Sequence, residues 1–208
     1  MEYLLMDLNM PYKATFTREQ FLFHEMRIVA QLMLEEKADE EITEMIVSNN
    51  LFQYPTEKSI KRIAQNCLKR LHLLNDQRMI KLIVDGSLDC ARQTCLYAMM
   101  NEYRVIYEFM TSVIGEKYRT KDFSFSKRDV NVFFSRLQEQ SDVIASWSNS
   151  TIKKLKQVIV KMLVDTQFLD STKSELLNVV LIDPDLKNIL MEKRDIAALT
   201  AFNSFEGV

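Results

Sequence analysis

Glycine and proline are scarce in this chain, and that scarcity limits its possible folds more than any other sequence feature. Its 208 residues include only 3 Gly and 3 Pro. A sheet-rich fold needs many tight turns built from these two residues, so long helices are predicted instead. Three glycines are also too few to assemble a phosphate-binding loop or a dinucleotide-binding fingerprint. We therefore expect a mainly helical protein without a glycine-rich nucleotide site.

The composition is that of an ordinary globular protein, with 47% hydrophobic and 27% charged residues and a formal net charge of -2. Cys67, Cys90 and Cys95 lack C-x-x-C spacing, which favours reduced thiols and a cytoplasmic location. The first 13 residues carry early acids and no basic start, so no secretory signal is expected. No uncharged apolar run approaches the roughly 20 residues of a membrane helix, which predicts no membrane span.

Helical periodicity and capping signals divide the chain into successive helices. They are predicted to start near Thr17, at Asp39, after Thr56, after Asp76, at Ser87, near Arg104, at Ser126, after Ser148 and at Asp183–Pro184. Gly86 stands where a left-handed residue would end a helix. Residues 176–182 are rich in Leu, Val and Ile, which predicts a short strand.

These elements predict an all-α fold, a multi-helix bundle with two parts packed as one compact unit. Residues 1–120 would form an N-terminal helical bundle. Residues 121–208 would form a winged-helix-like subdomain with at most a short strand pair, because helix, helix, strand and short helix follow one another there.

The run from Trp147 to Asp170 predicts a capped helix with one buried face and one lysine face. Residues 148–150 (Ser, Asn, Ser) have side-chain oxygens suited to cap its start. Apolar residues recur at helical spacing from Ile152 to Leu163 and form the buried face. Between Lys153 and Lys161 the run holds four lysines and no acid. Such a helix is suited to contact phosphates, although a merely solvated basic face is an open alternative.

A second basic face is predicted on the helix that follows Thr56. From Lys58 to Lys81 the chain carries seven basic residues and one acid. The polar residues Lys58, Arg62, Gln65, Lys69 and His72 share one face, opposite an apolar stripe. The alternative is that the acidic helix at 39–44, which has four acids and no base, packs beside this face and neutralises it.

The sequence does not provide the residues of a catalytic or metal site. His24 and His72 are the only histidines, and no local spacing brings them together with carboxylates or thiols as a metal site would require. No glycine elbow accompanies a cysteine or serine nucleophile. We therefore expect no cofactor, no metal and no small-molecule substrate, and a protein that is not an enzyme.

Four segments taken together resemble the BrxA family of BREX phage-defence systems. They are NLFQYPTEKSIKRIAQNCLKRLHLL, LIVDGSLDCARQTCLYAMM, IGEKYRTKDFSFSKRDVNVFF and SWSNSTIKKLKQVIVKMLVDTQFLD. The family's pattern corresponds here to Asn50–Phe52, Glu116–Tyr118 and Trp147–Lys154. The resemblance extends from about Thr17 to Leu190, and its specificity lies in the order of the short motifs.

The resemblance implies a compact, all-helical cytoplasmic protein, similar in part to the NusB-like RNA-binding bundle. It also implies double-stranded DNA binding within an anti-phage system that includes a methyltransferase and an ATPase. Some members of the family have been described as inner-membrane proteins, but the hydropathy of this chain argues against that location.

The leading hypothesis is therefore a non-enzymatic DNA-binding component of a BREX complex. The candidate phosphate contacts are Lys58, Lys61, Arg62, Lys69 and Arg70 on one helix, and Ser150, Thr151, Lys153, Lys154, Lys156 and Lys161 on the other. Little sequence specificity is expected, because neither helix carries an Arg and Asn set for base edges. Two alternatives stay open: a protein adaptor that docks other BREX components through these faces, and RNA binding by analogy with NusB.

Overall fold

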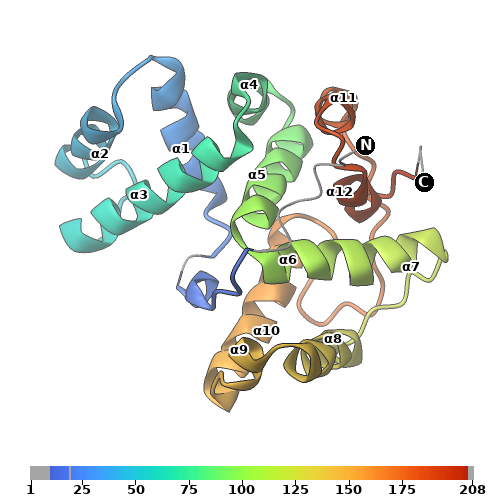
Figure 1. Cartoon of the computed structure of the whole chain (residues 1–208). Coiled ribbons are helices and arrows are strands. Elements are labelled where there is room, and N and C mark those ends of the chain that lie inside the picture. The colour runs from blue at the N-terminus through green and yellow to red at the C-terminus, as the bar shows by residue number, and fades with distance from the viewer. Residues whose placement is uncertain (1–9, 19, 206–208) are drawn as a thin grey trace. The chain divides into compact units, whose positions relative to one another are not determined.

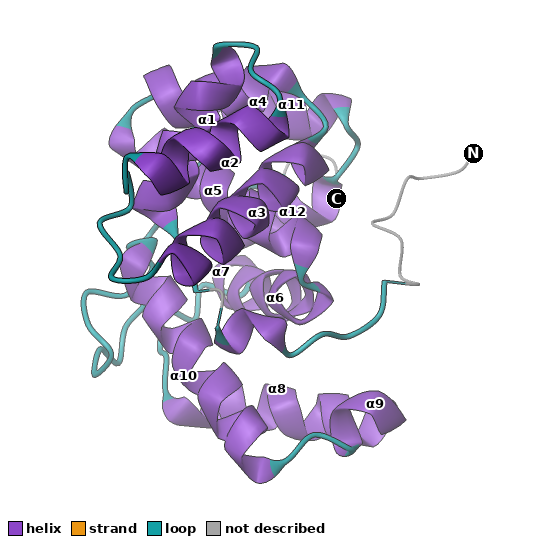
Figure 2. Cartoon of the chain, turned by 90° about the vertical axis from the view of Figure 1, so that its left-hand side faces the viewer, coloured by secondary structure: helices purple, strands orange, loops and turns teal. Residues whose placement is uncertain are grey.

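The structure is a computed structural model that describes residues 10–18 and 20–205. Those residues form helices joined by loops, with no strand among them (Figure 2), which confirms the predicted all-helical class. They belong to two compact units. Residues 21–102 make the first, here called the inserted unit, and the segments before and after it make the second, the flanking unit. The predicted parts, residues 1–120 and 121–208, divide the chain differently and stay a prediction, as do the NusB-like and winged-helix-like details.

The inserted unit is built around the long helix α3. Its helices are α1 (Phe23–Leu34), α2 (Asp39–Ser48), α3 (Glu57–Leu74), α4 (Gln77–Asp85) and α5 (Leu88–Glu102) (Figure 1). The α3 helix packs against α1, α2 and α5, with its predicted apolar stripe buried from Ile60 to Leu74. Its charged face is therefore left for the surface and for the neighbouring α2.

The flanking unit contains the lysine-faced helix. Its elements are η1 (Thr15–Thr17), α6 (Arg104–Phe109), η2 (Met110–Ile114), α7 (Gly115–Arg119), α8 (Lys127–Gln140), α9 (Asp142–Ala145), α10 (Asn149–Asp165), α11 (Pro184–Glu192) and α12 (Ile196–Ala201). Helices α6, η2 and α7 follow one another without a break, and η2 is one π-helical stretch. The α10 helix packs against α8 and η1.

Side-chain caps fix several helix starts at the predicted positions. Ser126 and Asp129 form a capping box at α8, with the Ser126 backbone N–H donating to the Asp129 carboxylate at 2.7 Å. Ser148 accepts from the Thr151 N–H at the start of α10, at 3.2 Å. Asp183 caps α11, which begins at Pro184 as expected. These starts were predictable because the signal and its partner lie within four residues.

Three local predictions are wrong. The helix expected from Thr17 begins at Phe23, after Leu22 in a left-handed conformation with φ 54°. Gly86 is extended, with φ -69°, and a Cβ there would lie 2.4 Å from the Leu82 carbonyl oxygen, so close packing is what favours glycine. Residues 176–182 form no strand, because only Leu176 makes a β-bridge, to Ser124.

None of the helices in the described ranges is long and apolar enough to cross a membrane. The prediction that the chain lacks a secretory signal concerns mainly residues 1–9, which lie outside the described residues.

Candidate nucleic-acid interface

The first half of α3 presents three cations to solvent. Lys58, Lys61 and Arg62 are exposed, and none forms an ion pair or hydrogen bond through its side chain with another described residue. They lie in the first two turns of the helix, where the helix dipole adds partial positive charge. This part of the predicted site is therefore open to an anionic ligand.

The second half of α3 is different, because one buried carboxylate binds both of its candidate cations. Glu102, at the end of α5, lies 2.7 Å from Arg70 Nε and 2.6 Å from Lys69 Nζ. Arg70 is 0% exposed and its guanidinium also contacts the Phe21 carbonyl oxygen at 3.5 Å. Arg70 is thus a core residue, and its prediction as a phosphate contact is wrong. Lys69 keeps an exposed side chain but already has a partner.

Glu102 is charged in this position because the two cations outweigh the effect of its burial. Burial alone would raise the pKa of the carboxyl group. The charge of Arg70 and the hydrogen bonds from Lys69 and Arg70 act in the opposite direction and hold the pKa below its usual value of 4.5. The group is therefore part of the fold's internal ion pairing and is not a candidate proton donor.

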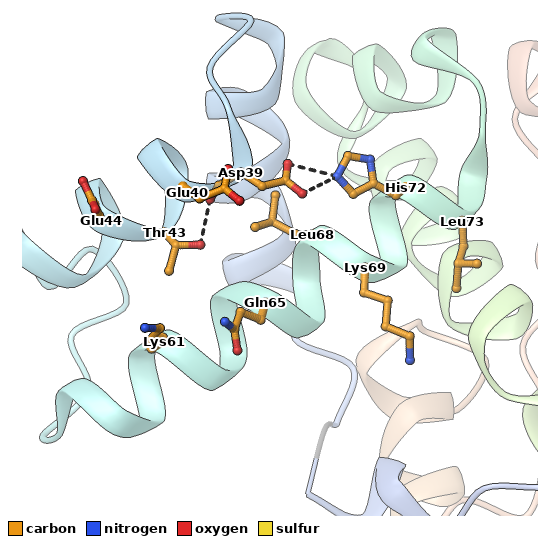
Figure 3. A pocket seen from close by; sticks show the side chains of 10 residues that line it. All are labelled: Asp39, Glu40, Thr43, Glu44, Lys61, Gln65, Leu68, Lys69, His72 and Leu73. Atoms are coloured by element: carbon orange, nitrogen blue, oxygen red, sulfur yellow. Dashed lines mark hydrogen bonds and ion pairs between the residues drawn. The ribbon is translucent and has the colours of Figure 1, made fainter.

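Helix α2 places acidic residues beside the predicted basic face. A groove of about 680 Å³ separates α2 from α3, with Asp39, Glu40 and Glu44 on the α2 side (Figure 3). Figure 3 shows the Asp39 carboxylate directed toward the His72 ring, at 2.9 Å. Lys61 and Lys69 line the same groove. On the groove side of α3, the acidic helix therefore packs beside the basic face, as the alternative expected. A phosphate would meet less opposing charge at Lys58 and Arg62, which do not line this groove, than at Lys61.

The lysines of helix α10 are also of two kinds, those without a side-chain partner among the described residues and those that already have one. Lys153 and Lys154 are exposed, and neither is paired with any residue that the structure describes. Lys156 donates to the Asn131 side chain at 2.9 Å and lies 5.6 Å from the Phe134 ring centre. Lys161 forms an ion pair with Asp165 at 2.8 Å, one turn along the helix. The structure therefore leaves the first two lysines as the open cations.

The start of α10 brings three hydroxyl groups together. The Ser148 hydroxyl lies 2.9 Å from both the Ser150 and the Thr151 hydroxyl oxygens. Because Ser148 already accepts the Thr151 N–H, Ser150 and Thr151 are held beside the cap, two to four residues before Lys153 and Lys154. Hydroxyl donors at a helix start next to open ammonium groups suit an anionic oxygen.

Metal ligation and thiol chemistry find no support among the described residues. They contain no group of three or more His, Cys, Asp or Glu arranged to hold a metal ion. All three cysteines are free and buried. Burial raises the pKa of the Cys67 and Cys95 thiols, so these two groups stay protonated and unreactive at neutral pH.

The structure also shows two open cations that the sequence interpretation did not single out. Arg128 and Arg136 on α8 are exposed, and neither guanidinium pairs with a described residue. They stand eight residues apart on one helix face, a spacing visible in the sequence. The spacing alone does not mark the two arginines as a site, because α8 lacks a concentrated basic run.

Comparison with known proteins gives consistent matches over most of the chain. The family model described as BrxA matches residues 10–194. The chain is 35% identical over 162 residues to the BREX protein BrxA of Bacillus cereus (strain H3081.97), covering 78% of this chain and 80% of that protein. It is 27% identical over 166 residues to the BREX protein BrxA of Escherichia coli O9:H4 (strain HS), covering 80% and 78%.

A solved structure has a similar fold. The crystal structure of an uncharacterized protein from Magnetospirillum magneticum matches with a TM-score of 0.77 at 20% sequence identity. The match covers 93% of this chain and 99% of the other. At this identity the likeness concerns the fold alone.

Proposed function

Since this chain belongs to the BrxA family of BREX phage-defence systems, we propose that it is a non-enzymatic component that binds double-stranded DNA by its phosphates. The supporting observation is the set of five exposed cations without a partner among the described residues: Lys58, Lys61 and Arg62 on α3, and Lys153 and Lys154 on α10. Each set lies on a helix whose other side is buried, so the backbone holds the charges in place.

Phosphate contact explains why lysines predominate in this set. Lysine offers a hydrated point charge that suits a backbone phosphate, whereas base edges are read by bidentate Arg, Asn or Gln. Ser150 and Thr151 would add neutral hydrogen bonds at the start of α10. Lys69, Lys156 and Lys161 would contribute less, because each already has a partner.

A gel-shift titration of a blunt DNA duplex at several salt concentrations tests the proposal. Affinity should fall as salt rises, because each neutralised phosphate releases counterions. The double variants Lys58→Gln/Arg62→Gln and Lys153→Gln/Lys154→Gln should each weaken binding and reduce the slope of log affinity against log salt by about 2.

The matched control is Lys81→Gln/Lys173→Gln, which removes the same charge at exposed positions outside both helices. Equal weakening by the control and the test variants would contradict a local contact, and salt-independent affinity would contradict phosphate binding altogether. An RNA duplex of the same length that binds more tightly would favour the NusB-like alternative.

The acidic wall of the α2–α3 groove favours a second candidate, a protein adaptor for other BREX components. A partner with both signs of charge could meet Asp39 and Glu40 on one side and Lys61 on the other. Co-purification with the other components of the system, with and without nuclease, separates the two: binding that survives nuclease and is lost in Asp39→Asn/Glu40→Gln supports the adaptor.

A further inference from the structure

A second groove lies in the flanking unit, and its lining includes no residue of α3 or α10. It has a volume of about 580 Å³ and is lined by residues of α8 and of the continuous helix α6–η2–α7. The π-helical residues Thr111, Ser112 and Val113 form part of its wall. Such π-helical stretches occur frequently at functional sites, where they reshape a helix surface. The groove is therefore a candidate binding site, because the π-helical stretch forms part of its wall.

Helix α8 presents a simple pattern to this groove. Arg128, Val132 and Arg136 line it at positions i, i+4 and i+8. Val132 is 38% exposed, which is high for a valine in a helix that packs on its other side. The two arginines are exposed and about 12 Å apart along the helix axis, at a rise of 1.5 Å per residue. Arg128, Val132 and Arg136 thus form a stripe in which an apolar side chain lies between two cations, with about one helical turn from each residue to the next.

The carboxylates that line the groove are already engaged within the flanking unit. Glu108 is held by Arg104 at 2.6 Å, Glu116 by Arg119 at 2.7 Å, and Asp129 by Lys117 at 3.2 Å. Neither Arg128 nor Arg136 takes part in these pairs or in any other with the described residues. Lys117 is shared with Asp122 at 3.0 Å, but the cations of this region still outnumber its carboxylates by one, and the cations left unpaired among the described residues are the two arginines.

We propose that this groove docks a helix of a partner protein whose exposed stripe carries carboxylate, apolar side chain and carboxylate at i, i+4 and i+8. The spacing of such a stripe equals that of Arg128, Val132 and Arg136, so both carboxylates meet a guanidinium at once. Guanidinium groups bind carboxylates in a two-point, planar geometry. The apolar side chain covers Val132 and removes it from water.

The same features disfavour nucleic acid in this groove. A duplex carries closely spaced phosphates, more than the two unpaired arginines of this groove can neutralise. It would also leave Val132 without an apolar partner. A partner helix with only two carboxylates, eight residues apart, would place its negative charges beside Arg128 and Arg136 and nowhere else in the groove. The inference is thus independent of the DNA contacts proposed for α3 and α10.

A synthetic helical peptide is the probe for this docking. The peptide carries Glu, Leu and Glu at i, i+4 and i+8 with a fluorescent label, and its anisotropy is titrated with the full chain. We expect saturable binding that weakens by at least about tenfold in Arg128→Gln/Arg136→Gln. Lys127→Gln is the matched control, since Lys127 is the neighbouring exposed cation on α8 and does not line the groove. A peptide with Gln in place of both Glu residues should bind far more weakly.

Several results would overturn the inference. They are the absence of saturable binding, equal binding of the Glu and Gln peptides, and an unchanged affinity in the double arginine variant. Loss of duplex DNA binding in that variant, with displacement of the peptide by DNA, would assign the groove to nucleic acid instead. Self-association that disappears in the double variant would assign it to a second copy. Circular dichroism confirms that the variant folds, and Lys153→Gln/Lys154→Gln should leave peptide binding unchanged even if DNA binding fails.

Discussion

At the scale of single residues, Arg70 marks the limit of the sequence interpretation. In the sequence it continues the basic run of Lys69 and looks like another surface cation. Its partner Glu102 lies 32 positions away, and no helical periodicity reveals a pair that depends on how α3 meets α5. The exposed cations Lys58 and Arg62 were correctly placed on the surface because they lie far from the apolar stripe. Position on one helix is predictable, but burial against another helix is not.

The buried ion pair of Arg70 and Glu102 predicts a large loss of stability when its carboxylate is replaced by an amide. Glu102→Gln keeps the shape of the side chain but leaves the Arg70 guanidinium charged and without a carboxylate in the core. Removing one partner of a buried pair lowers the free energy of unfolding by about 3–5 kcal/mol. Lys69→Met removes the half-exposed partner and should cost less than about 1 kcal/mol. Urea denaturation of the two variants measures the difference, and equal losses would contradict the assigned roles.

The same carboxylate gives a pH dependence of defined sign. The folded state lowers the pKa of Glu102 below 4.5, so its contribution to stability is fully present above that pH. The contribution is lost as pH falls through the lower, folded-state pKa. Denaturation on both sides of pH 4.5 should therefore show a steeper acid loss in the natural chain than in Glu102→Gln.

At the scale of elements, short-range signals predicted well and long-range pairing did not. The capping box of Ser126 and Asp129 and the Asp183–Pro184 start were readable because each is complete within a few residues. Residues 176–182 have the composition of a strand, but backbone pairing needs a neighbour, and the structure provides one only at Leu176. The groove beside α8 was likewise not predictable, since its walls come from helices that are separate in the sequence.

The contact between α7 and α12 provides a test at this scale. A Cβ on Gly115 would lie 2.5 Å from Thr200 Oγ1 and 3.2 Å from the Thr200 backbone carbon. Alanine favours a helix, so Gly115→Ala would normally stabilise it by roughly 0.5–1 kcal/mol. Here the forced displacement of α12 should outweigh that gain and lower stability by about 1–2 kcal/mol. Thermal unfolding measures the change, and adding Thr200→Ala should recover part of it because the closest atom is removed.

At the scale of the whole molecule, the formal net charge of -2 makes the placement of charge decisive. At this net charge the chain as a whole is not expected to attract DNA, so binding must come from local cations. Each phosphate contact contributes about 0.9 to the slope of log affinity against log salt. Contact through α10 alone predicts a slope of about 1.8, through α3 alone about 2.7, and through both about 4.5.

That slope reports how many of the proposed helices contact one duplex. Gel shifts of the unmodified chain across a salt series provide it directly. A value near the largest figure is expected if α3 and α10 both contact the same duplex, and a value near either smaller figure is expected if one helix acts alone. A value well above about 5 would show that cations outside α3 and α10 also bind, contrary to the proposed set.

Arg70 also has a topological consequence. Through one guanidinium it contacts Phe21, the first residue of the inserted unit, and Glu102, the last. The two ends of that stretch are therefore tied together inside its own fold, and little further chain entropy is lost when a host sequence joins them. We therefore expect residues 21–102 to tolerate transfer into a related chain as one segment that contains both Arg70 and Glu102.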